Sequence, residues 1–376
     1  MYRLGELKLA RILILANNDV GLYKFRKELI QELLNNGNEV YISLPNGQFI
    51  QQLVNMGCKY IQSDIDRRGL NPFKDIKLLI LYLSIFNKVK PDMVITYTVK
   101  PNIYGGIISR IKKIPYYINI TGLGSAFQSR GYLKKIIVTL YKLSCKKANI
   151  VFFENDENKK IFVENNIIEE AKSFKLNGAG VNLEEYQLYE YPVDNSELRF
   201  LFIGRVMKEK GIDELFEAAK LIKNEFTDVY FDIIGPLEDD YLKIIEQLES
   251  EQIIKYYGFQ DDIKPFIAQS HCFILPSYHE GMANTLLECG AMGRPLITSN
   301  IYGCKESVSN NKNGYLVKPK STQDLYEKIK QFIELSYEQK KNMGKFSRKH
   351  IEKNFDKKKV VDITIENMIK VNNKNL

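Results

Sequence analysis

Two glutamates and the glycine turn beside the first of them form the most chemically informative segment. Glu280 follows a short apolar run and precedes Gly281, and Glu288 lies eight residues after Glu280, inside a helical pattern. Glycine permits close approach of the backbone, and unpaired N–H groups at a helix start attract anions. Glutamates bind hydroxyl pairs well and phosphates poorly. The segment therefore predicts a ligand with two hydroxyl-bearing ends and an anionic centre, such as a nucleotide sugar.

The predicted start of this helix supplies the anion site. We expect the helix to begin near Ala283 and the ligand to contact Met282, Ala283, Asn284 and Thr285. If the segment is helical throughout, Glu280 and Glu288 are about 12 Å apart, roughly the span from sugar to ribose. Such a glutamate pair is frequent in helices, but it is far less common after a strand and a glycine turn.

A basic loop is the second candidate element. Gly204, Arg205, Lys210 and Gly211 follow an apolar run that is predicted to be a strand. The carboxyl ends of parallel strands face the ligand crevice in doubly wound sheets. Arginine and lysine there suit a leaving diphosphate, with the glycines freeing the backbone. Alone, this loop would more simply be an exposed basic turn; beside the glutamate segment, a diphosphate site is favoured.

Short β-branched runs alternate with amphipathic stretches along nearly the whole chain, which favours parallel sheets covered by helices. The expected strands number too many for one open sheet, so the fold class is α/β with two doubly wound domains. They are residues 11–16, 39–44, 59–62, 93–96, 116–120, 150–153, 173–176, 199–204, 229–234, 254–257, 272–275, 295–298 and 315–317. Glycine, proline and asparagine cluster in 177–196. We expect domains at 1–180 and 181–355, followed by a C-terminal crossover helix over 356–376 that returns to the N-terminal domain.

Composition excludes several classes of protein. With 44% hydrophobic and 27% charged residues, the chain is too apolar for intrinsic disorder. Its longest apolar run, 78–86, is too short to span a bilayer, and no secretory signal is recognisable. Five scattered cysteines and three histidines give no disulfide framework and no metal-ligand spacing. We therefore expect a cytoplasmic protein without a metal or cofactor; Asp64 and Asp66 form a lone D-x-D that is read as a turn.

Charge is distributed unevenly. Residues 1–150 hold 23 Lys and Arg against 9 Asp and Glu, a net charge of +14, and the remainder carries −6. Not one acidic residue lies between Asp92 and Glu154. Such a stretch suggests an anionic partner. In 132–147, Lys135, Lys142 and Lys146 share one helical face, opposite an apolar face that either packs in the core or lies on a membrane. The acid-free surroundings favour the membrane.

The two candidate segments together resemble the retaining glycosyltransferases of family 4, which have the GT-B fold. GRVMKEKG (204–211) matches that family's G-R-(x)n-K-G loop, and EGMANTLLE (280–288) matches its E-x7-E motif. GFQDDI (258–263), NGAGVNLEEY (177–186) and RPLITSNIYGCKE (294–306) are further matches. The resemblance implies that Glu280 contacts the donor sugar, Glu288 contacts the ribose, and Arg205 with Lys210 binds the diphosphate.

Three N-terminal motifs resemble the branch that builds capsules, O-antigens and lipid-linked oligosaccharides: RRGLNP (67–72), TYTVKPN (96–102) and ITGLGS (120–125). In that branch the N-terminal domain receives an acceptor sugar on undecaprenyl diphosphate. The residues thereby implied in substrate binding are Arg67, Lys100, Asn102, Thr121 and Gly122, and Gly21 after the first strand gives the backbone access to a substrate. Many relatives have histidine where this chain has Thr121, which leaves the recognition of the sugar open.

The resulting hypothesis is a retaining, metal-independent enzyme that moves a hexose or N-acetylhexosamine from a UDP-sugar to an undecaprenyl-diphosphate-linked saccharide. We expect it on the anionic inner face of the cytoplasmic membrane, with no nucleic-acid partner. One alternative is a UDP-sugar epimerase on the same fold, which has no need of a basic acceptor domain. Another is a non-enzymatic protein that binds nucleic acid or anionic surfaces, although no nucleic-acid-binding motif is present.

Overall fold

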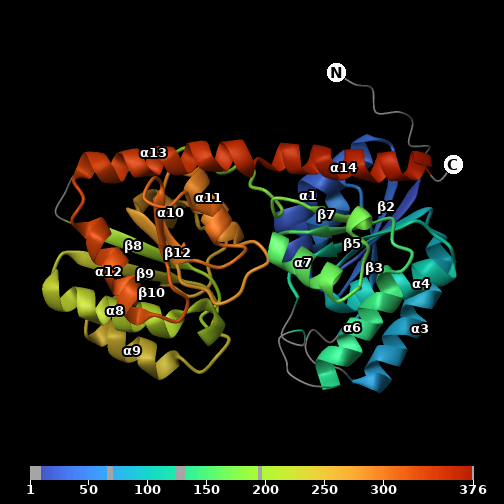
Figure 1. Ribbon diagram of the computed structural model, residues 1–376, viewed down its shortest axis with the longest axis horizontal. Coiled ribbons are helices and arrows are strands. Elements are labelled where there is room, and N and C mark those ends of the chain that lie inside the picture. The colour runs from blue at the N-terminus through green and yellow to red at the C-terminus, as the bar shows by residue number, and fades with distance from the viewer. Residues whose placement is uncertain (1–9, 66–70, 124–126, 128–131, 194–196, 375–376) are drawn as a thin grey trace. The chain divides into compact units, whose positions relative to one another are not determined.

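The computed structural model describes residues 10–65, 71–123, 127, 132–193 and 197–374 (Figure 1). The chain divides into two compact units, one formed by residues 1–179 with 358–376 and the other by residues 180–357. Arg67 and Asp66, both singled out from the sequence, lie outside the described residues. Each unit is an α/β layered structure built around its own parallel sheet.

The N-terminal unit is organised by a seven-stranded sheet in the order β3-β2-β1-β4-β5-β6-β7. Every neighbouring pair of these strands is parallel. The order reverses between β1 and β4, which is the switch point where doubly wound sheets open their ligand crevice. The strands are β1 Arg11–Leu15, β2 Glu39–Leu44, β3 Lys59–Gln62, β4 Met93–Tyr97, β5 Tyr116–Ile120, β6 Ile150–Phe153 and β7 Ser173–Lys175.

Helices cover both faces of this sheet. Asparagine side chains cap three of them: Asn18 begins α1, Asn71 with Pro72 begins α3, and Asn155 begins α7, which satisfies amides that a helix start leaves unpaired. The helices are α1 Asp19–Asn35, α2 Ile50–Asn55, α3 Pro72–Val89, η1 Pro101–Gly105, α4 Gly106–Ile111, α6 Tyr132–Cys145, α7 Asp156–Glu164, η2 Glu170–Lys172 and α14 Lys357–Lys374.

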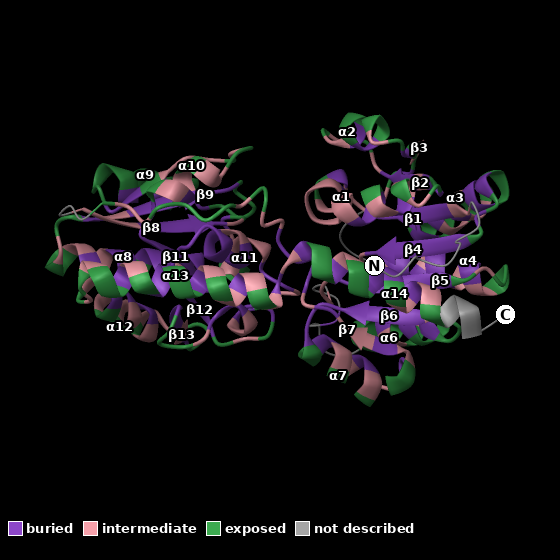
Figure 2. Cartoon of the chain, turned by 90° about the horizontal axis from the view of Figure 1, so that it is seen from above, coloured by how far each residue is buried: buried purple, intermediate pink, exposed green. Residues whose placement is uncertain are grey.

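The strands at the centre of the sheet are largely buried (Figure 2). Residues that alternate along β1 belong to two different cores. In β1, Ile12 and Ile14 pack with α1, α2 and α14. Leu13 and Leu15 point the other way and pack with α3, α4, α6 and α7. The central strands β1, β4, β5 and β6 are therefore buried on both faces, which explains why they read as continuous apolar runs, whereas the edge strand β3 is partly exposed.

The C-terminal unit repeats this design with six parallel strands in the order β10-β9-β8-β11-β12-β13. The strands are β8 Leu198–Ile203, β9 Val229–Ile234, β10 Ile254–Tyr256, β11 Cys272–Leu275, β12 Leu296–Ser299 and β13 Gly314–Val317. The helices are η3 Lys208–Lys210, α8 Ile212–Glu225, α9 Leu242–Ser250, α10 Lys264–Gln269, α11 Asn284–Ala291, η4 Lys305–Ser307, α12 Thr322–Ile333 and α13 Tyr337–Asn354.

The last helix, α14, is part of the N-terminal unit although it follows the C-terminal one in sequence. Val360, Ile365 and Met368 are buried in the core that contains β1 and α1. The hydroxyl of Tyr117 on β5 donates to the carbonyl oxygen of Met368 at 2.8 Å. The expected return of the C-terminal helix is thus confirmed, as is the fold class with two doubly wound sheets.

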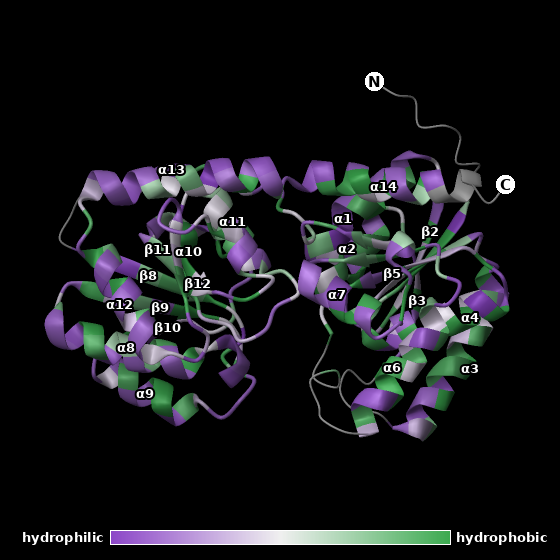
Figure 3. Cartoon of the chain, viewed as in Figure 1, coloured by the Kyte–Doolittle hydropathy of each residue, from purple (hydrophilic) through white to green (hydrophobic). Residues whose placement is uncertain are grey.

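Among the described residues, no helix has the length and apolarity required to cross a bilayer. Apolar residues are concentrated in the strands and on the inner sides of the helices (Figure 3).

Candidate active site

The first strand of the C-terminal unit ends in a tight turn from which Arg205 emerges. A side chain at Gly235 would place its Cβ 1.8 Å from the carbonyl oxygen of Gly204, so β8 and β9 approach closely here only because residue 235 is glycine. Nη1 of Arg205 lies 3.7 Å from Oε1 of Glu238, and 48% of the arginine side chain is exposed. A long, exposed ion pair of this kind contributes little to stability. The guanidinium therefore keeps donors for a ligand.

Gly211 lets the loop after β8 pack directly on the loop after β11. Its φ is 71°, and a Cβ there would lie 2.1 Å from the carbonyl oxygen of Pro276. Tyr278 also joins the loop after β11 to the segment after β8. Its N–H donates to the carbonyl of Glu209 in η3 at 2.9 Å, and its hydroxyl donates to the carboxylate of Glu214 on α8 at 2.7 Å. The two segments identified in the sequence are thus held against each other.

This packing brings Lys210 and Glu280 into contact. The ammonium of Lys210 lies 2.5 Å from Oε1 of Glu280, and the hydroxyl of Ser277 donates to the same oxygen at 2.8 Å. The two charged side chains are 18% and 11% exposed. Ser277 is a site residue that the sequence analysis missed, although it lies only three residues before Glu280. Arg205 is paired with a different carboxylate, that of Glu238.

The start of α11 differs from the expectation. The helix begins at Asn284, one residue later, and the N–H of Ala283 is not unpaired: it donates to the carbonyl of Gly303 at 2.8 Å. Gly303 can approach because it has no side chain; a Cβ there would lie 2.6 Å from the carbonyl oxygen of Gly281. The expected anion site therefore loses the Ala283 amide, because the loop after β12 caps this helix.

Of the residues next to Ala283, Met282 packs in the core, whereas Asn284 and Thr285 are candidate ligand contacts. Met282 is 5% exposed and packs in an apolar cluster with Leu287, so its side chain is structural. Oδ1 of Asn284 is buried and accepts no hydrogen bond from any residue that the structure describes. A buried acceptor without a donor is costly, which makes this amide a candidate ligand contact. Thr285 is partly exposed on the first turn of the helix.

Glu288 lies on α11 and is partly buried. It is hydrogen-bonded to Tyr186, and burial, reinforced by the charge of Glu288, raises the pKa of that tyrosine well above its ordinary value. The eight-residue interval between the glutamates is not helical throughout, because Glu280 lies in the loop before α11. The expected separation of one continuous helix therefore does not apply, and the loop instead directs Glu280 toward Lys210.

In the N-terminal unit, Gly21 lies in the first turn of α1, where its N–H donates to Oδ1 of Asn18 at 2.6 Å. A Cβ at this position would lie 2.8 Å from the same oxygen. The helix cap therefore accounts for a glycine at position 21, and the N–H of Gly21 already donates a hydrogen bond to Asn18.

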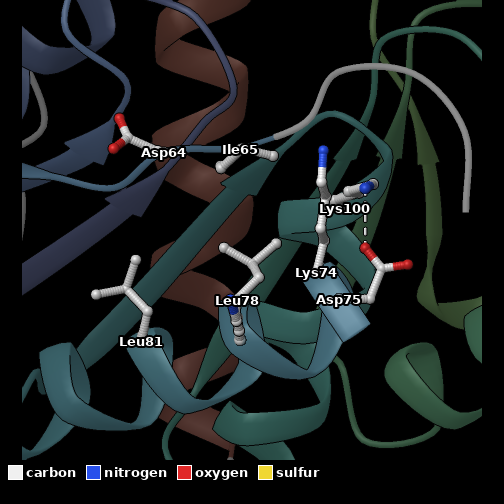
Figure 4. Close-up of a pocket in the computed structure, with 8 residues that line it drawn as sticks. Asp64, Ile65, Lys74, Asp75, Leu78, Leu81 and Lys100 are labelled. Carbon is white, nitrogen blue, oxygen red and sulfur yellow. Dashed lines mark ion pairs between the residues drawn. The ribbon is translucent and has the colours of Figure 1, made fainter. Parts of the chain in front are cut away.

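Lys100 and Asn102 are buried. The ammonium of Lys100 lies 2.8 Å from Oδ1 of Asp75 on α3, beside a cavity (Figure 4). Asn102 donates to the carbonyl of Asn119 at 2.9 Å and so joins the π-helix η1 to β5. Both residues are held mainly by contacts within the unit.

Thr121 and Gly122 directly follow β5 and are partly exposed, and a Cβ at Gly122 would meet open space. The motif positions 121 and 122 therefore remain accessible to a substrate.

An ion pair at the end of β6 was not anticipated. Nη2 of Arg26 lies 2.5 Å from Oε1 of Glu154, with side chains 13% and 9% exposed, and the guanidinium stacks over the ring of Tyr97 at 5.1 Å. Glu154 is the first acidic residue after the long acid-free stretch, and this position in the sequence could have identified it as a candidate for an ion pair.

The described residues contain no group of three or more histidine, cysteine, aspartate or glutamate side chains that could hold a metal ion. Asp64 is exposed after β3, and its D-x-D partner Asp66 lies outside those residues. All five cysteines are buried and unpaired. Burial raises the pKa of Cys58 to about 11 and that of Cys145 to about 12, so both thiols stay protonated.

Two family models match the chain in succession. Residues 11–155 match the family described as glycosyl transferase 4-like, and residues 188–350 match the family described as glycosyl transferases group 1. Together with two doubly wound sheets, this pair of matches defines a glycosyltransferase of the GT-B class. Both models describe glycosyl transferases, and together they cover most of the chain, as the resemblance to family 4 led us to expect.

Two curated relatives are glycosyltransferases by name, and a solved structure has the same fold. The chain is 28% identical over 340 residues to the N,N'-diacetylbacillosaminyl-diphospho-undecaprenol alpha-1,3-N-acetylgalactosaminyltransferase of Campylobacter jejuni, covering 86% of this chain and 89% of that protein. It is 28% identical over 304 residues to the UDP-Gal:alpha-D-GlcNAc-diphosphoundecaprenol alpha-1,3-galactosyltransferase of Escherichia coli, covering 73% and 77%. Anabaena Alr3699/HepE, solved in complex with UDP and glucose, has the same fold with a TM-score of 0.78, 17% identity and coverage of 95% and 98%.

Proposed function

We propose that this protein is a retaining glycosyltransferase that moves a hexose or N-acetylhexosamine from a UDP-sugar to a saccharide on undecaprenyl diphosphate. The contact between Lys210 and Glu280 carries the proposal. It joins the loops that follow β8 and β11, two neighbouring strands of one parallel sheet. Ligands of such sheets bind beyond the carboxyl ends of the strands, where this contact lies.

Cationic and anionic side chains would hold different parts of the donor. An ammonium has three donors, so Lys210 can bind Glu280 and still donate to a diphosphate oxygen. Arg205, half exposed, would add a planar fork of donors to the same diphosphate. Glu280 would accept from sugar hydroxyls and Glu288 from the ribose. Asn284, whose amide oxygen is buried without a donor among the described residues, would contribute a further contact to the donor.

We propose retention of configuration from the resemblance to family 4, and the surroundings of Glu280 bear on how retention would be achieved. Its Oε1 already accepts from Lys210 and Ser277, and hydrogen bonds to a carboxylate stabilise the charged form and lower its nucleophilicity. A double displacement through Glu280 is therefore disfavoured. In our proposal the acceptor hydroxyl attacks the anomeric carbon on the face from which the UDP leaves. The departing phosphate oxygen takes the hydroxyl proton, while Lys210 and Arg205 stabilise the developing negative charge.

The acceptor side of the proposal has two supports. The two curated relatives named above act, by their names, on saccharides carried by diphosphoundecaprenol. The N-terminal half of this chain has the excess of basic residues that an anionic membrane surface attracts. We therefore propose that the enzyme binds peripherally at the inner face of the cytoplasmic membrane. We also propose that it works without a metal ion, because Lys210 and Arg205 can stabilise the leaving diphosphate.

Mass spectrometry of the lipid-linked product tests the proposal. The purified protein is incubated with undecaprenyl-diphosphate-linked saccharides and a panel of UDP-sugars. A mass gain of one sugar, with an α-configured new linkage by NMR, is the expected result. Epimerised UDP-sugar without any gain in acceptor mass, or a β-linked product, would overturn it.

A further inference from the structure

Tyr186 ends the segment 177–186 and lies against helix α11. Its side chain is partly buried and packs on the apolar cluster that contains Leu287 and Ala291 of that helix. The residue that follows Leu287 is Glu288, the glutamate that we assign to the ribose of the donor. Phenylalanine would serve this packing equally well, so the hydroxyl of Tyr186 needs an explanation of its own.

The hydroxyl of Tyr186 is hydrogen-bonded to the carboxylate of Glu288. Burial, and then the negative charge of Glu288, raise the pKa of Tyr186 well above its ordinary value, so the phenol keeps its proton and is the donor. The two oxygens of an ionised carboxylate accept about four hydrogen bonds. The bond from Tyr186 occupies about one of these positions, so it is compatible with further bonds from the hydroxyls of a ligand.

The backbone of Tyr186 is tied to both α11 and α13, two helices that pack against each other (Figure 1). Nη1 of Arg348 on α13 donates to the carbonyl of Tyr186 at 2.8 Å and to the carbonyl of Ala291, the last residue of α11, at 2.9 Å. The N–H of Tyr186 donates to the carbonyl of Asn182 at 2.9 Å. The phenol therefore extends from a fixed backbone, which is what a hydrogen bond needs if it is to hold a flexible side chain in place.

Glu288 shares one face of α11 with Asn284, which lies four residues earlier in the same helix. Oδ1 of Asn284 is buried and accepts no hydrogen bond from the described residues, which indicates that a ligand meets this face. A glutamate side chain has several rotatable bonds, and fixing them costs conformational entropy. A hydrogen bond that fixes the carboxylate before the ligand arrives removes this cost from binding.

We propose that Tyr186 is a positioning residue whose hydroxyl orients the carboxylate of Glu288 toward the ribose hydroxyls of the donor. Tyr186 takes no part in the chemical step and acts only through Glu288. This inference rests on the proposed function, since it concerns how that enzyme recognises the ribose. The property that depends on Tyr186 is therefore the preference for a ribonucleotide, and not the affinity for any nucleoside diphosphate.

Nucleotide binding tests the inference without any sugar transfer. Isothermal titration calorimetry on the full chain measures Kd for UDP and for 2′,3′-dideoxyuridine diphosphate, which lacks both ribose hydroxyls. We expect the wild type to prefer UDP. Tyr186→Phe keeps the ring and its packing; it should weaken UDP binding about tenfold, the effect of losing a hydrogen bond to a charged group, and leave binding of the dideoxynucleotide nearly unchanged. In steady-state kinetics the same variant should raise KM for the donor and leave kcat unchanged.

Two further variants show whether the tyrosine acts through the glutamate. In the double variant Tyr186→Phe/Glu288→Gln the preference for UDP should equal that of Glu288→Gln alone. The matched control is Tyr326→Phe on α12, whose hydroxyl also donates to a carboxylate of the same unit, that of Glu225. Glu225 ends α8, a helix of 14 residues that begins directly after the basic loop, so about 20 Å of helix separates this contact from the donor site. Tyr326→Phe should bind both nucleotides like the wild type.

Equal losses of affinity for both nucleotides in Tyr186→Phe, with thermal unfolding unchanged, would overturn the inference, because they would show a purely structural role. An undiminished preference for UDP in that variant would also overturn it, as would a wild type that binds the two nucleotides equally. Additive effects of the two substitutions on the preference would mean that Tyr186 does not act through Glu288. A preference for UDP that depends on Tyr186 supports the inference even where no sugar reaches the lipid-linked acceptor, so a failure of the proposed function is recognised separately.

Discussion

Lys210 and Glu280 are 70 residues apart in sequence, yet the ammonium of one lies 2.5 Å from the carboxylate of the other. The contact depends on Gly211, where any side chain would collide with the carbonyl of Pro276 and push the two loops apart. Lysine and glutamate together can hold the two unlike parts of one donor, the diphosphate and the sugar.

The first prediction concerns the two cations of the diphosphate site. Lys210→Ala and Arg205→Ala should each lower kcat by about 10²-fold or more, the typical cost of losing one group that stabilises developing charge. Arg205→Ala should leave the free energy of unfolding within about 0.5 kcal/mol, since its ion pair is long and half exposed. Steady-state kinetics and thermal unfolding measure both effects. Normal turnover in either variant would remove that residue from the site.

The second prediction separates the glutamates. Glu280→Gln should lower kcat, because it loses the charge beside the reacting carbon, whereas Glu288→Gln should mainly raise KM for the donor. Ser277→Ala should lower kcat about tenfold without changing KM, because it frees the carboxylate that the hydroxyl orients. Kinetics with the donor varied give this split. Equal effects of the two glutamate changes on kcat and KM would contradict the assigned roles.

A third prediction concerns metal ions. Excess EDTA should leave the initial rate nearly unchanged, since we assign the stabilisation of the diphosphate to Lys210 and Arg205. The assay follows UDP release with and without chelator. Loss of activity on chelation and its recovery with Mn²⁺ would require a metal site, and Asp64 and Asp66 would be tested first.

The fourth prediction concerns three lysines on α6 and directly after it. Lys135 and Lys142 of α6 and Lys146, which follows the last residue of that helix, are exposed, and together they could contribute roughly 3 kcal/mol to binding at an anionic surface. Changing all three to Glu should abolish sedimentation with anionic vesicles at low salt and activity on the lipid-linked acceptor. Activity on a short soluble acceptor should persist. Undiminished vesicle binding by the triple variant would place the docking surface elsewhere.

The fifth prediction concerns pH and stability. Burial, aided by the charge of Arg294, lowers the pKa of His271 to about 4, and its Nδ1 accepts from the N–H of Arg199 at 3.1 Å. The folded state therefore binds the proton less tightly than the unfolded state. Stability should be full above pH 6.5 and fall toward pH 4 by at most roughly 1.4 kcal/mol per pH unit from this group.

His271→Asn keeps an acceptor but does not titrate in this range. Denaturant unfolding between pH 7 and pH 4.5 should therefore be less pH-dependent in this variant than in the wild type. Equal slopes would show that other groups dominate the loss.

Secondary structure was largely predictable from the sequence. The strands β2, β3, β5, β6, β9 and β11 have the predicted bounds, and the other predicted strands differ by a residue at one or both ends. The central strands of both sheets are buried on both faces, and such burial requires apolar residues at successive positions, which the sequence shows directly. The edge strand β3 is partly exposed. The glycines at 204 and 211 and the charged positions 205, 210, 280 and 288 could be singled out for a similar reason: their types and spacing are local properties.

The contacts between distant segments were decided only by the tertiary structure. The N–H of Ala283 looks unpaired from its place at a helix start, but the carbonyl of Gly303 occupies it. Likewise, the apolar positions of α3 form a regular pattern, yet only packing determines that Tyr82 is buried and Phe73 is exposed. Periodicity describes one helix by itself, whereas burial and hydrogen bonding depend on which partner the chain brings to each face.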